Sequence, residues 1–547
     1  MSRHAARLAA FSVVASGGLA SALAVSLPAR SAALDSTTAA TTTAPTVTSA
    51  AAEVLAVSGH GWGHGLGMSQ WGAYGYALHG YSAARILAHY YPGTTLGPAS
   101  TRTVRVLLAR GKRLSLGSAG AWTAVDATGA KVALDAGTVD LTPSSRLQGH
   151  AVTLPVTLSS AAPIALGGKP YRGRIVVAPD GKALEAIDVV ALESYVKGVV
   201  PAEMPSDWPA AALQAQAVAA RSYALANLVQ GRAFDLYDDV RSQVYGGIDA
   251  ESPSSSAAVD ATKGQVALYG GKVADTLFFS TSGGRTASAA ELLGSPVPYL
   301  VSVPDPYDTL SPFHDWGPVL FDVQSVAKKL KLTPPVSGVQ VAAGPSGRAQ
   351  TVTVVGAGDA EASFTGAQVR AVLGLRSTWF SPSLYSLAPQ RAAVTYGGTV
   401  ALTGFVQGAS GVALEAKPYG RDWASAGTVT LRSDGSFEVP VSPKLRTSYR
   451  LSAGAVRAGL ASVTVAPKVV ATIATSGVAG SVRPAVASDA VELQKGAGAA
   501  WSTVSSTATD AGGRFTFGGP LAPGDYRVRV APGGGLQPGL SSVVTVP

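Results

Sequence analysis

Residues 192–225 hold two helical patterns on either side of a short segment flanked by prolines, and this arrangement constrains the fold more than any other part of the chain. Apolar side chains recur at three- and four-residue intervals from Leu192 to Val200, which is typical of a helix with one buried face. Proline disrupts such a helix because it has no amide proton to donate. The first helix is therefore predicted to end at Pro201.

The second helical pattern is rich in alanine. Ser206 or Asp207 can accept hydrogen bonds from the free amides at its start. Pro209 suits its first turn, and Gly231 can end it. About 22 residues at roughly 1.5 Å each predict a rod about 33 Å long. Alanine favours helices and lets neighbouring backbones approach closely, so we expect a long, buried, central helix.

One acid, Glu203, lies between the two patterns, where Pro201 and Pro205 restrict the backbone. Met204 and Trp208 can shield its carboxyl group from water, which would raise its pKa toward the range of a general acid. A lone glutamate in a loop is more commonly a solvated surface charge. The surrounding motif is what favours a catalytic role.

The motif around Glu203 contains LE-x-Y, GVV, EMP and, after a spaced proline, AQA-x-AAR-x-Y-AL. Its positions are Leu192, Glu193, Tyr195, Gly198–Val200, Glu203–Pro205 and Ala215–Leu225. This pattern resembles the sporulation stage II protein D family, also called the amidase-enhancer (LytB-type) family, whose studied members are lytic transglycosylases acting on peptidoglycan. The resemblance implies that Glu203 is the catalytic residue.

Further segments extend the resemblance over roughly residues 58 to 382. They are Val104–Ala109, Tyr171–Val177, Arg241–Gly247, Phe278–Gly294, His314–Gly317 and Val369–Phe380. The first two are the strands expected before the catalytic helix. By family position, substrate contacts are expected from Ser242, Gln243 and Tyr245, and from a close-approach loop containing Ser282 and Arg285.

The segment GHGWGHGLGMSQWGAYGYA, residues 59–77, departs from the family order. In many members this block closes the domain, whereas here it precedes the other motifs, so the order looks permuted. Chain ends often lie close together in space, and a segment moved from one end to the other can therefore fill the same position. We expect the block to fold back beside Glu203.

The alternating glycines of this block leave little side-chain bulk, so its backbone can approach a sugar chain closely. Donors, acceptors and an aromatic face are then available from His60, His64, Ser69, Gln70 and Trp71. These five residues are predicted to form a saccharide subsite. The alternative is a glycine-rich turn whose histidines are merely hydrogen-bonded.

Glycosidic bond cleavage by a hydrolase normally uses two carboxyl groups. A lytic transglycosylase can use one, because the acid that protonates the bridging oxygen can then deprotonate the C6 hydroxyl of muramic acid, giving a 1,6-anhydro end. Glu203 would perform both steps. Four nearby acids leave a second catalytic carboxylate open: Asp188, Glu193, Asp238 and Asp239. For Glu193, a structural contact with Arg221 or a backbone amide is expected instead.

Two histidines four residues apart suggest a metal site, since zinc accepts imidazole ligands. However, the HExxH pattern is absent and the chain has no cysteine, so no metal or cofactor is predicted. The net charge of +9 comes with only 14% charged residues and no dense basic stripe, and nucleic acid is not expected as a partner. This charge suits binding to anionic wall polymers.

Residues 1–33 have the pattern of an export signal. A short positive region precedes an apolar run from Leu8 to Leu27, and Ser31–Ala33 offers small residues for cleavage. Residues 34–52 are predicted to be a flexible tether rich in Thr, Ala and Ser. The protein is expected to be secreted and associated with the cell wall, with membrane contact only if the signal stays uncleaved.

The catalytic domain is expected to span residues 53–387 as an α+β fold, with β strands flanking the long central helix. Residues 318–360 look rich in strands, with a short helix from Asp322 to Lys331. A joint at residues 388–393, which contains proline and alanine, is expected to separate this domain from the C-terminal third.

The C-terminal third contains an internal repeat. Trp423 recurs as Trp501 at an offset of 78 residues, and other aromatic positions recur with them. Alternating strands broken by SDGS and AGGR turns predict two small Ig-like β-sandwiches, residues 391–467 and 468–547. The two tryptophans are expected in the sandwich cores, and the alternative is that they are sugar-stacking platforms.

The leading hypothesis is an exported peptidoglycan lytic transglycosylase that uses Glu203 as acid and then as base. The alternative is a non-catalytic wall-binding protein that recruits or stimulates an amidase, as the family's second name implies. In both hypotheses the main partner is the glycan strand of peptidoglycan.

Overall fold

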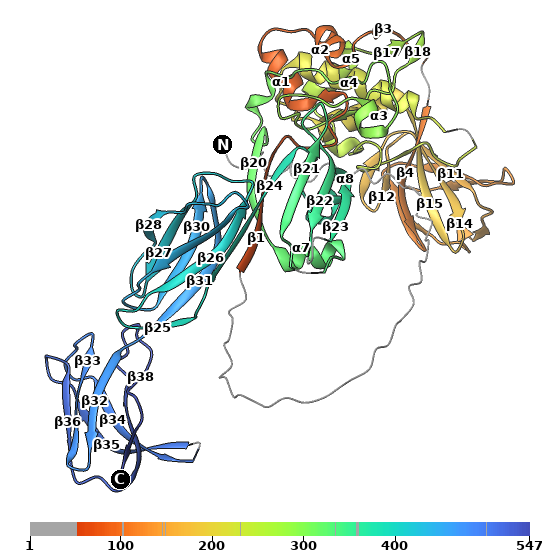
Figure 1. The fold of residues 1–547 in the computed structure, drawn as a ribbon. Helices are drawn as coiled ribbons and strands as arrows, with labels where there is room; N and C mark the ends of the chain where they lie inside the picture. The colour runs from red at the N-terminus through yellow and green to blue at the C-terminus, as the bar shows by residue number, and fades with distance from the viewer. Residues whose placement is uncertain are drawn as a thin grey trace, which may run out of the picture.

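The computed structural model describes residues 52–100, 103–144, 146–147, 149–229, 231–333, 335–356, 360–498 and 500–547. Almost all of the predicted signal and tether, residues 1–52, lies outside these ranges. Helices and strands occur together as far as the last described helix, and strands alone follow it in the blue part of Figure 1. The expected α+β region followed by a β-rich region is confirmed.

The described residues form eight α-helices, none of them both long and apolar enough to cross a membrane. They are α1 (Gln70–Leu78), α2 (Ala83–Tyr90), α3 (Leu192–Glu203), α4 (Ala210–Ala226), α5 (Pro253–Ala261), α6 (Ala289–Leu293), α7 (Val323–Leu330) and α8 (Gly366–Leu373). α4 lies at the centre of a cluster and contacts α1, α2, α3 and α5 (Figure 1). Most of its alanines are fully buried, which lets these neighbours approach closely.

α3 does not end at Pro201 as predicted. It continues to Glu203, and the Met204 amide still donates to the Val200 carbonyl at 2.9 Å. Pro201 removes one amide donor in the final turn, so only the end of the helix loses a hydrogen bond. Glu203 is therefore the last residue of a helix and not part of a loop.

α4 is shorter than predicted. It has 17 residues, which at roughly 1.5 Å each make it about 26 Å long. Pro209 occupies the position before its first residue, and no side chain caps it, so the expected caps Ser206 and Asp207 are wrong. The helix ends at Ala226, ahead of the predicted stop at Gly231.

The predicted contact between Glu193 and Arg221 is confirmed. The Nε and Nη2 atoms of Arg221 donate to the two carboxylate oxygens of Glu193 at 3.0 and 2.8 Å. Arg221 is fully buried and also donates to the Gln265 carbonyl at 3.0 Å. The Gly264 amide donates to Glu193 at 3.1 Å. This ion pair joins α3 and α4 to the start of strand β17 (Gln265–Tyr269).

A seven-stranded sheet leads into α3. Its order is β16 (Leu236–Tyr237), β4 (Thr103–Gly111), β15 (Ala183–Ala191), β14 (Arg174–Asp180), β11 (Val156–Ser160), β6 (Trp122–Val125) and β7 (Lys131–Leu134). The strand predicted at Val104–Ala109 is β4, whereas segment 171–177 bends before β14 begins. Because β15 continues directly into α3, the sheet fixes the base of the helix that ends at Glu203.

A five-stranded sheet incorporates the N-terminal strand. Its order is β20 (Asp315–Asp322), β1 (Ala52–His60), β24 (Phe380–Pro389), β26 (Val400–Gln407) and β29 (Ser436–Val441). β1 is antiparallel to both neighbours, with Val54 opposite Asp322 and Tyr385. The sheet also crosses the predicted joint at residues 388–393, because β24 pairs with β26.

Four smaller sheets complete the N-terminal part. Their strands are β2 (Met68–Ser69), β3 (Thr95–Pro98), β9 (Arg146–Leu147), β10 (His150–Ala151), β18 (Lys272–Val273) and β19 (Phe278–Phe279), then β5 (Leu114–Ser118), β8 (Gly137–Leu141), β12 (Ile164–Leu166) and β13 (Lys169–Tyr171). In these sheets β17 pairs with β3 and β18, β2 with β19, β9 with β10, and β12 with β13 and β5, which also pairs with β8.

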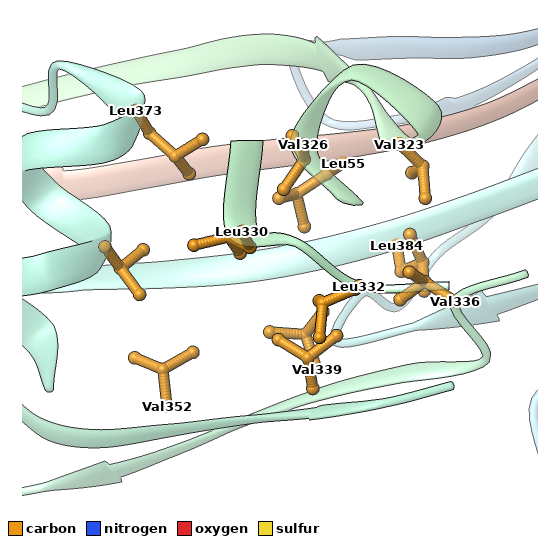
Figure 2. A pocket seen from close by; sticks show the side chains of 12 residues that line it. Leu55, Val323, Val326, Leu330, Leu332, Val336, Val339, Val352, Leu373 and Leu384 are labelled. Atoms are coloured by element: carbon orange, nitrogen blue, oxygen red, sulfur yellow. The ribbon is translucent and has the colours of Figure 1, made fainter. Parts of the chain in front are cut away.

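A small unit of α7, α8 and a three-stranded sheet packs near β1 and β24. The sheet contains β21 (Gly338–Ala343), β22 (Ala349–Val355) and β23 (Glu361–Thr365). The helix predicted at 322–331 is α7, which Asp322 caps by accepting from the Ser325 amide. Figure 2 shows the pocket inside this unit, lined only by leucine and valine side chains. Such a pocket fits core packing, because a sugar site also needs hydrogen-bonding groups.

Two β-sandwiches form the C-terminal part, each with a separate apolar core. The first places β25 (Ala393–Thr395), β27 (Ala413–Pro418), β28 (Ala424–Thr428), β30 (Thr447–Ala453) and β31 (Val456–Ala466) against β24, β26 and β29. The second contains β32 (Lys468–Ala474), β33 (Gly477–Arg483), β34 (Ala490–Ala497), β35 (Ala500–Ala508), β36 (Arg514–Gly518), β37 (Gly524–Val530), β38 (Gly539–Leu540) and β39 (Val544–Val546). An Ig-like arrangement of these strands stays a prediction.

The expectation that Trp423 and Trp501 are core residues is wrong. Both are half-buried, and neither belongs to the core of its sandwich. Phe437 and Phe515 occupy those cores instead, together with aliphatic side chains from the facing sheets. The two tryptophans therefore keep surface that the fold does not cover.

Glu193→Ala is expected to destabilise the protein by about 3–5 kcal/mol, because it leaves the buried Arg221 guanidinium without its carboxylate. The control is Asp260→Asn, which breaks a more exposed ion pair with Lys197 and should cost less than about 1 kcal/mol. Denaturant unfolding of both variants measures the difference. Equal losses would contradict a stabilising role for the buried pair.

Candidate active site

Glu203 presents its carboxyl group at the C-terminal end of α3. The Val244 amide donates to its Oε1 atom at 2.9 Å, which fixes the orientation of the carboxyl group. Part of the side chain reaches the surface, but the carboxyl group itself is shielded from water. This burial raises the pKa of Glu203 to about 7, although the Val244 hydrogen bond opposes the shift. Near neutral pH the group is therefore about half protonated.

The N-terminal block folds back beside Glu203, as predicted. β1 carries it into the five-stranded sheet, and β2 then pairs in parallel with β19. Ser69 caps α1 by accepting from the Gly72 amide at 3.1 Å, and Gln70 is the first residue of that helix. The buried Gln70 amide lies close enough to lower the pKa of Glu203, while its Nε2 atom has no hydrogen-bond partner among the described residues.

Three aromatic side chains gather next to this contact. Trp71 and Tyr74 on α1 meet Trp208 from the segment between α3 and α4, with ring centres 5.0 Å and 4.6 Å from that of Trp208. All three are half-buried, so each keeps an accessible surface. We call Trp71, Tyr74 and Trp208 the aromatic cluster. Tyr74 was missed in the sequence, although its three-residue spacing from Trp71 places both on one helix face.

Two residues that were predicted to contact the substrate, Gln243 and Tyr245, are buried in the protein interior. Gln243 is buried, accepts from the Tyr195 hydroxyl at 3.0 Å and donates to a backbone carbonyl of α4. Tyr245 is also buried and donates to Asp188 at 3.0 Å. Both side chains therefore use their polar atoms internally, which favours a positioning role over contact with a substrate.

A carboxylate that sequence reasoning missed, Asp308, holds the two glycine-rich loops together. It accepts from the Ser69 hydroxyl at 2.9 Å and from the Ser282 and Gly283 amides at 3.0 and 2.8 Å. His314 Nδ1 also contacts it at 3.1 Å. Ser69 and Ser282 are fully buried, so their polar atoms support the loops. The only available signal was the position of Asp308 a few residues before the HDWG motif.

The two histidines of the block have different surroundings. The Nδ1 atom of His64 accepts from the Leu66 amide, and its Nε2 donates to the Phe278 carbonyl, both at 3.0 Å. Burial lowers the pKa of His64 to about 4, so its ring is neutral and fixed. His60 is accessible and lies 2.6 Å from Asp315. For His64 the structure thus favours the alternative of a hydrogen-bonded turn.

The glycines of the block do not leave room for a sugar chain, which corrects the sequence interpretation. A Cβ atom added at Gly61 would lie 2.6 Å from the Thr281 carbonyl oxygen, and one at Gly63 would lie 2.8 Å from Phe279. At Gly65 the space is taken by the guanidinium of Arg348. The chain's own loops fill the space that these glycines leave.

Ser242 and Arg285 are half-buried, and so are not closed off from a ligand. The Ser242 hydroxyl accepts from the Tyr237 amide at 3.1 Å. The Arg285 carbonyl accepts from the buried Arg348 at 3.1 Å, which fixes the backbone of its loop. Substrate contact through Ser242, Arg285, His60 and Trp71 stays a prediction.

The other candidate carboxylates are not equivalent. Asp188 is fully buried against Tyr245, and Asp239 forms an ion pair with Arg241 at 2.8 Å, which lowers the pKa of Asp239. Asp238 is half-buried, and its pKa is raised by burial and also by the neighbouring charge of Asp239. Asp238 is therefore the strongest candidate for a second catalytic acid.

Comparisons with known proteins find relatives that match the region around Glu203. Residues 180–269 match the family model SpoIID, Stage II sporulation protein. The Bacillus subtilis (strain 168) proteins "Amidase enhancer" and "Stage II sporulation protein D" are 34% identical over 185 residues and 32% identical over 182 residues. An uncharacterised protein of Brachyspira hyodysenteriae is 41% identical over 141 residues.

The match to the amidase enhancer covers 34% of this chain and 25% of that protein. The match to the stage II sporulation protein D covers 30% of this chain and 53% of that protein. The match to the Brachyspira protein covers 25% of this chain and 38% of that protein. The chain thus spans at most about half the length of each of these relatives. The family resemblance inferred from the motifs is confirmed. Among solved structures, a tetra-tandem repeat from a large adhesion protein covers 82% of this chain and 100% of that chain at 10% identity, but its TM-score of 0.19 supports no argument.

The raised pKa of Glu203 makes its contribution to stability depend on pH. The ordinary value is 4.5 and the folded value is about 7, so the contribution is fully present below pH 4.5 and is lost as pH rises through about 7. Glu203→Gln cannot ionise. The variant is expected to gain about 3 kcal/mol over wild type between about pH 4 and pH 8, measured by denaturant unfolding. A difference that does not change with pH would contradict the shifted pKa.

Proposed function

We propose that this chain, whose residues 180–269 belong to the stage II sporulation protein D family, is an exported, wall-associated lytic transglycosylase that cleaves peptidoglycan strands. The observation that carries the proposal is the shielded Glu203 carboxyl group, whose pKa lies at about 7. A group with this pKa can both give up and take back a proton near neutral pH. That is the requirement for a reaction run by a single acid.

The proposed reaction has two steps. First, the protonated Glu203 donates its proton to the oxygen that bridges C1 of MurNAc and C4 of GlcNAc. The C1–O bond breaks, its electron pair stays on that oxygen, and positive charge develops at C1. Second, the Glu203 carboxylate removes the proton from the C6 hydroxyl of the same MurNAc, and that oxygen bonds to C1. A 1,6-anhydro ring forms, no water is consumed, and Glu203 is protonated again.

Residues around Glu203 support this chemistry. Because the Val244 amide holds Oε1, the proton is carried by the other carboxyl oxygen. Gln70 limits the rise in the pKa of Glu203, so the carboxyl group can lose its proton near neutral pH and act as a carboxylate in the second step. The aromatic cluster lies beside Gln70 and offers apolar faces on which sugar rings can stack. These contacts orient the acid and the substrate, and the proton transfers themselves are made by Glu203 alone.

Two other functions are supported by specific observations. The similarity to the Bacillus subtilis protein named amidase enhancer favours the alternative that this chain is a non-catalytic protein that stimulates an amidase. The half-buried Asp238, whose pKa is raised by burial, favours a hydrolase that uses a second carboxyl group. Hydrolysis would leave reducing MurNAc ends in place of anhydro ends.

Product analysis separates the three functions. Purified protein is incubated with peptidoglycan glycan strands, with and without stem peptides, and the strand ends are identified by mass spectrometry. Wild type should form 1,6-anhydro-MurNAc ends. Glu203→Gln keeps the size of the side chain but cannot exchange the proton, so the rate should fall at least about 100-fold.

The matched control is Asp238→Asn, which should keep the same product and most of the rate. Reducing ends that are lost in both variants would contradict the proposal and identify hydrolysis by two carboxyl groups. No cleavage by wild type, together with faster cleavage by an added amidase, would identify the enhancer function instead.

The pH profile tests the contact with Gln70. Glu203 must be protonated to act first as an acid, so kcat/KM should fall as pH rises through about 7. Gln70→Leu removes a group that lowers the pKa of Glu203, and should move this alkaline limb to higher pH. Trp71→Phe, the adjacent control, should leave the limb in place. A limb that does not move in Gln70→Leu would contradict the contact.

A further inference from the structure

The first C-terminal sandwich carries a stack of three side chains on the outside of its sheet. The Arg450 guanidinium lies 4.1 Å from the centre of the Trp423 ring. The Nε atom of Arg450 donates to Glu415 at 2.7 Å, and these two residues are directly opposite each other on β30 and β27. The tryptophan is half-buried, so part of its ring is accessible.

The second sandwich carries the same stack at equivalent positions. The Arg527 guanidinium lies 4.1 Å from the centre of the Trp501 ring. Its Nε atom donates to Gln494 at 2.9 Å, and these residues are again directly opposite, on β37 and β34. The geometry is therefore repeated, although Gln494 has no charge where the first sandwich has Glu415.

Neighbouring outward positions differ between the two sandwiches. Ser452, two residues after Arg450, corresponds to Arg529, two residues after Arg527. Lys417, two residues after Glu415 on β27, corresponds to Gly496, two residues after Gln494 on β34. The stack is kept while the positions around it change, so the stack itself is the shared feature of these two surfaces.

Stability accounts for little of this repetition. An exposed cation–π contact contributes about 0.5–1 kcal/mol, and an exposed ion pair about 0–1 kcal/mol. Both tryptophans lie outside the sandwich cores, so packing does not require them. The change from Glu415 to Gln494 also removes the ion pair and keeps only a hydrogen-bond acceptor. What both stacks retain is an arginine that lies over a partly accessible aromatic ring.

The guanidinium nitrogens that make no hydrogen bond within the protein indicate the chemical class of the ligand. In the described residues, Arg450 and Arg527 use only Nε in hydrogen bonds, so the two terminal nitrogens of each guanidinium are available. That edge binds a carboxylate or a phosphate in bidentate fashion. The ring beside it offers an apolar face to the C–H groups of a sugar. A sugar that carries an acidic group satisfies both parts at once.

Charge density distinguishes a carboxylate from a phosphate polymer. Residues 391–547 have 14 Lys and Arg against eight Asp and Glu, a modest positive excess. Each sandwich has one such stack, and in the first Glu415 pairs with both Arg450 and Arg457. A densely charged phosphate polymer calls for a continuous basic stripe. One stacked arginine per sandwich suits a glycan with widely spaced carboxylates.

We propose that the Trp423–Arg450 and Trp501–Arg527 stacks each bind a carboxylate-bearing sugar of a peptidoglycan strand from which the peptides have been removed. In such strands the lactyl group of every muramic acid ends in a free carboxylate, and the GlcNAc between them is neutral. This choice of polymer rests on the proposed function. Two linked sites on one strand raise the effective concentration at the second site, so two weak contacts hold the strand firmly.

Binding is measured in the full chain with Glu203→Gln, so that the probe is not consumed and failure of catalysis does not affect the result. The probe is a preparation of peptide-free glycan strands. Arg450→Gln with Arg527→Gln should weaken binding at least about 10-fold, because each substitution keeps a polar side chain but removes the charge and the terminal nitrogens of the guanidinium. Trp423→Ala with Trp501→Ala should have a similar effect.

The matched control is Arg432→Gln with Arg514→Gln, which removes two exposed arginines from the same sandwiches and should change binding less than about two-fold. Glycan strands whose carboxylates are amidated should bind only weakly to the protein that keeps both arginines. This affinity should equal that of the double arginine variant for unmodified strands. Thermal unfolding confirms that each variant is folded. Equal binding by test and control variants, or tighter binding of a polyol phosphate polymer, would overturn the proposal.

Discussion

The pairing of β1 between β20 and β24 is the contact on which the candidate site depends. This strand comes from the N-terminal end of the described chain, yet it lies inside a sheet whose other members come from residues 315–441. Its register brings the glycine-rich block against the 277–284 segment, so that α1 begins with Gln70 beside Glu203. A block that comes first in the chain can therefore complete a site built by later segments.

Burial then determines the chemistry that this arrangement allows. Glu203 is mounted on a helix that the Glu193–Arg221 pair fastens to α4, and the Val244 amide holds its carboxyl group in one orientation. The same exclusion of water that keeps His64 neutral raises the pKa of the acid. Asp308 joins Ser69, the residue before Gln70, to the backbone of Ser282 and Gly283. It therefore fixes the start of the helix that carries Gln70 to the site.

Sequence reasoning found the features that have a local signal. Glu203 and the Glu193–Arg221 pair follow from motifs and helical spacing, and a short helix was also expected where α7 lies. Strand partners have no such signal, so the insertion of β1 into a sheet and the bonds of Asp308 to Ser69, 239 residues away, could not be predicted in detail. The glycine spacing showed where bulk is absent, but only the fold shows that the protein's own loops fill that space.

The most direct test of these ideas is the ionisation of the Glu203 carboxyl group in the folded protein. Infrared difference spectra between wild type and Glu203→Gln, recorded across a pH series, separate the protonated carboxyl band from the carboxylate band of this one residue. The shielded environment predicts a midpoint at about pH 7. A midpoint near the ordinary value of 4.5 would show a solvated acid and would contradict the single-acid mechanism.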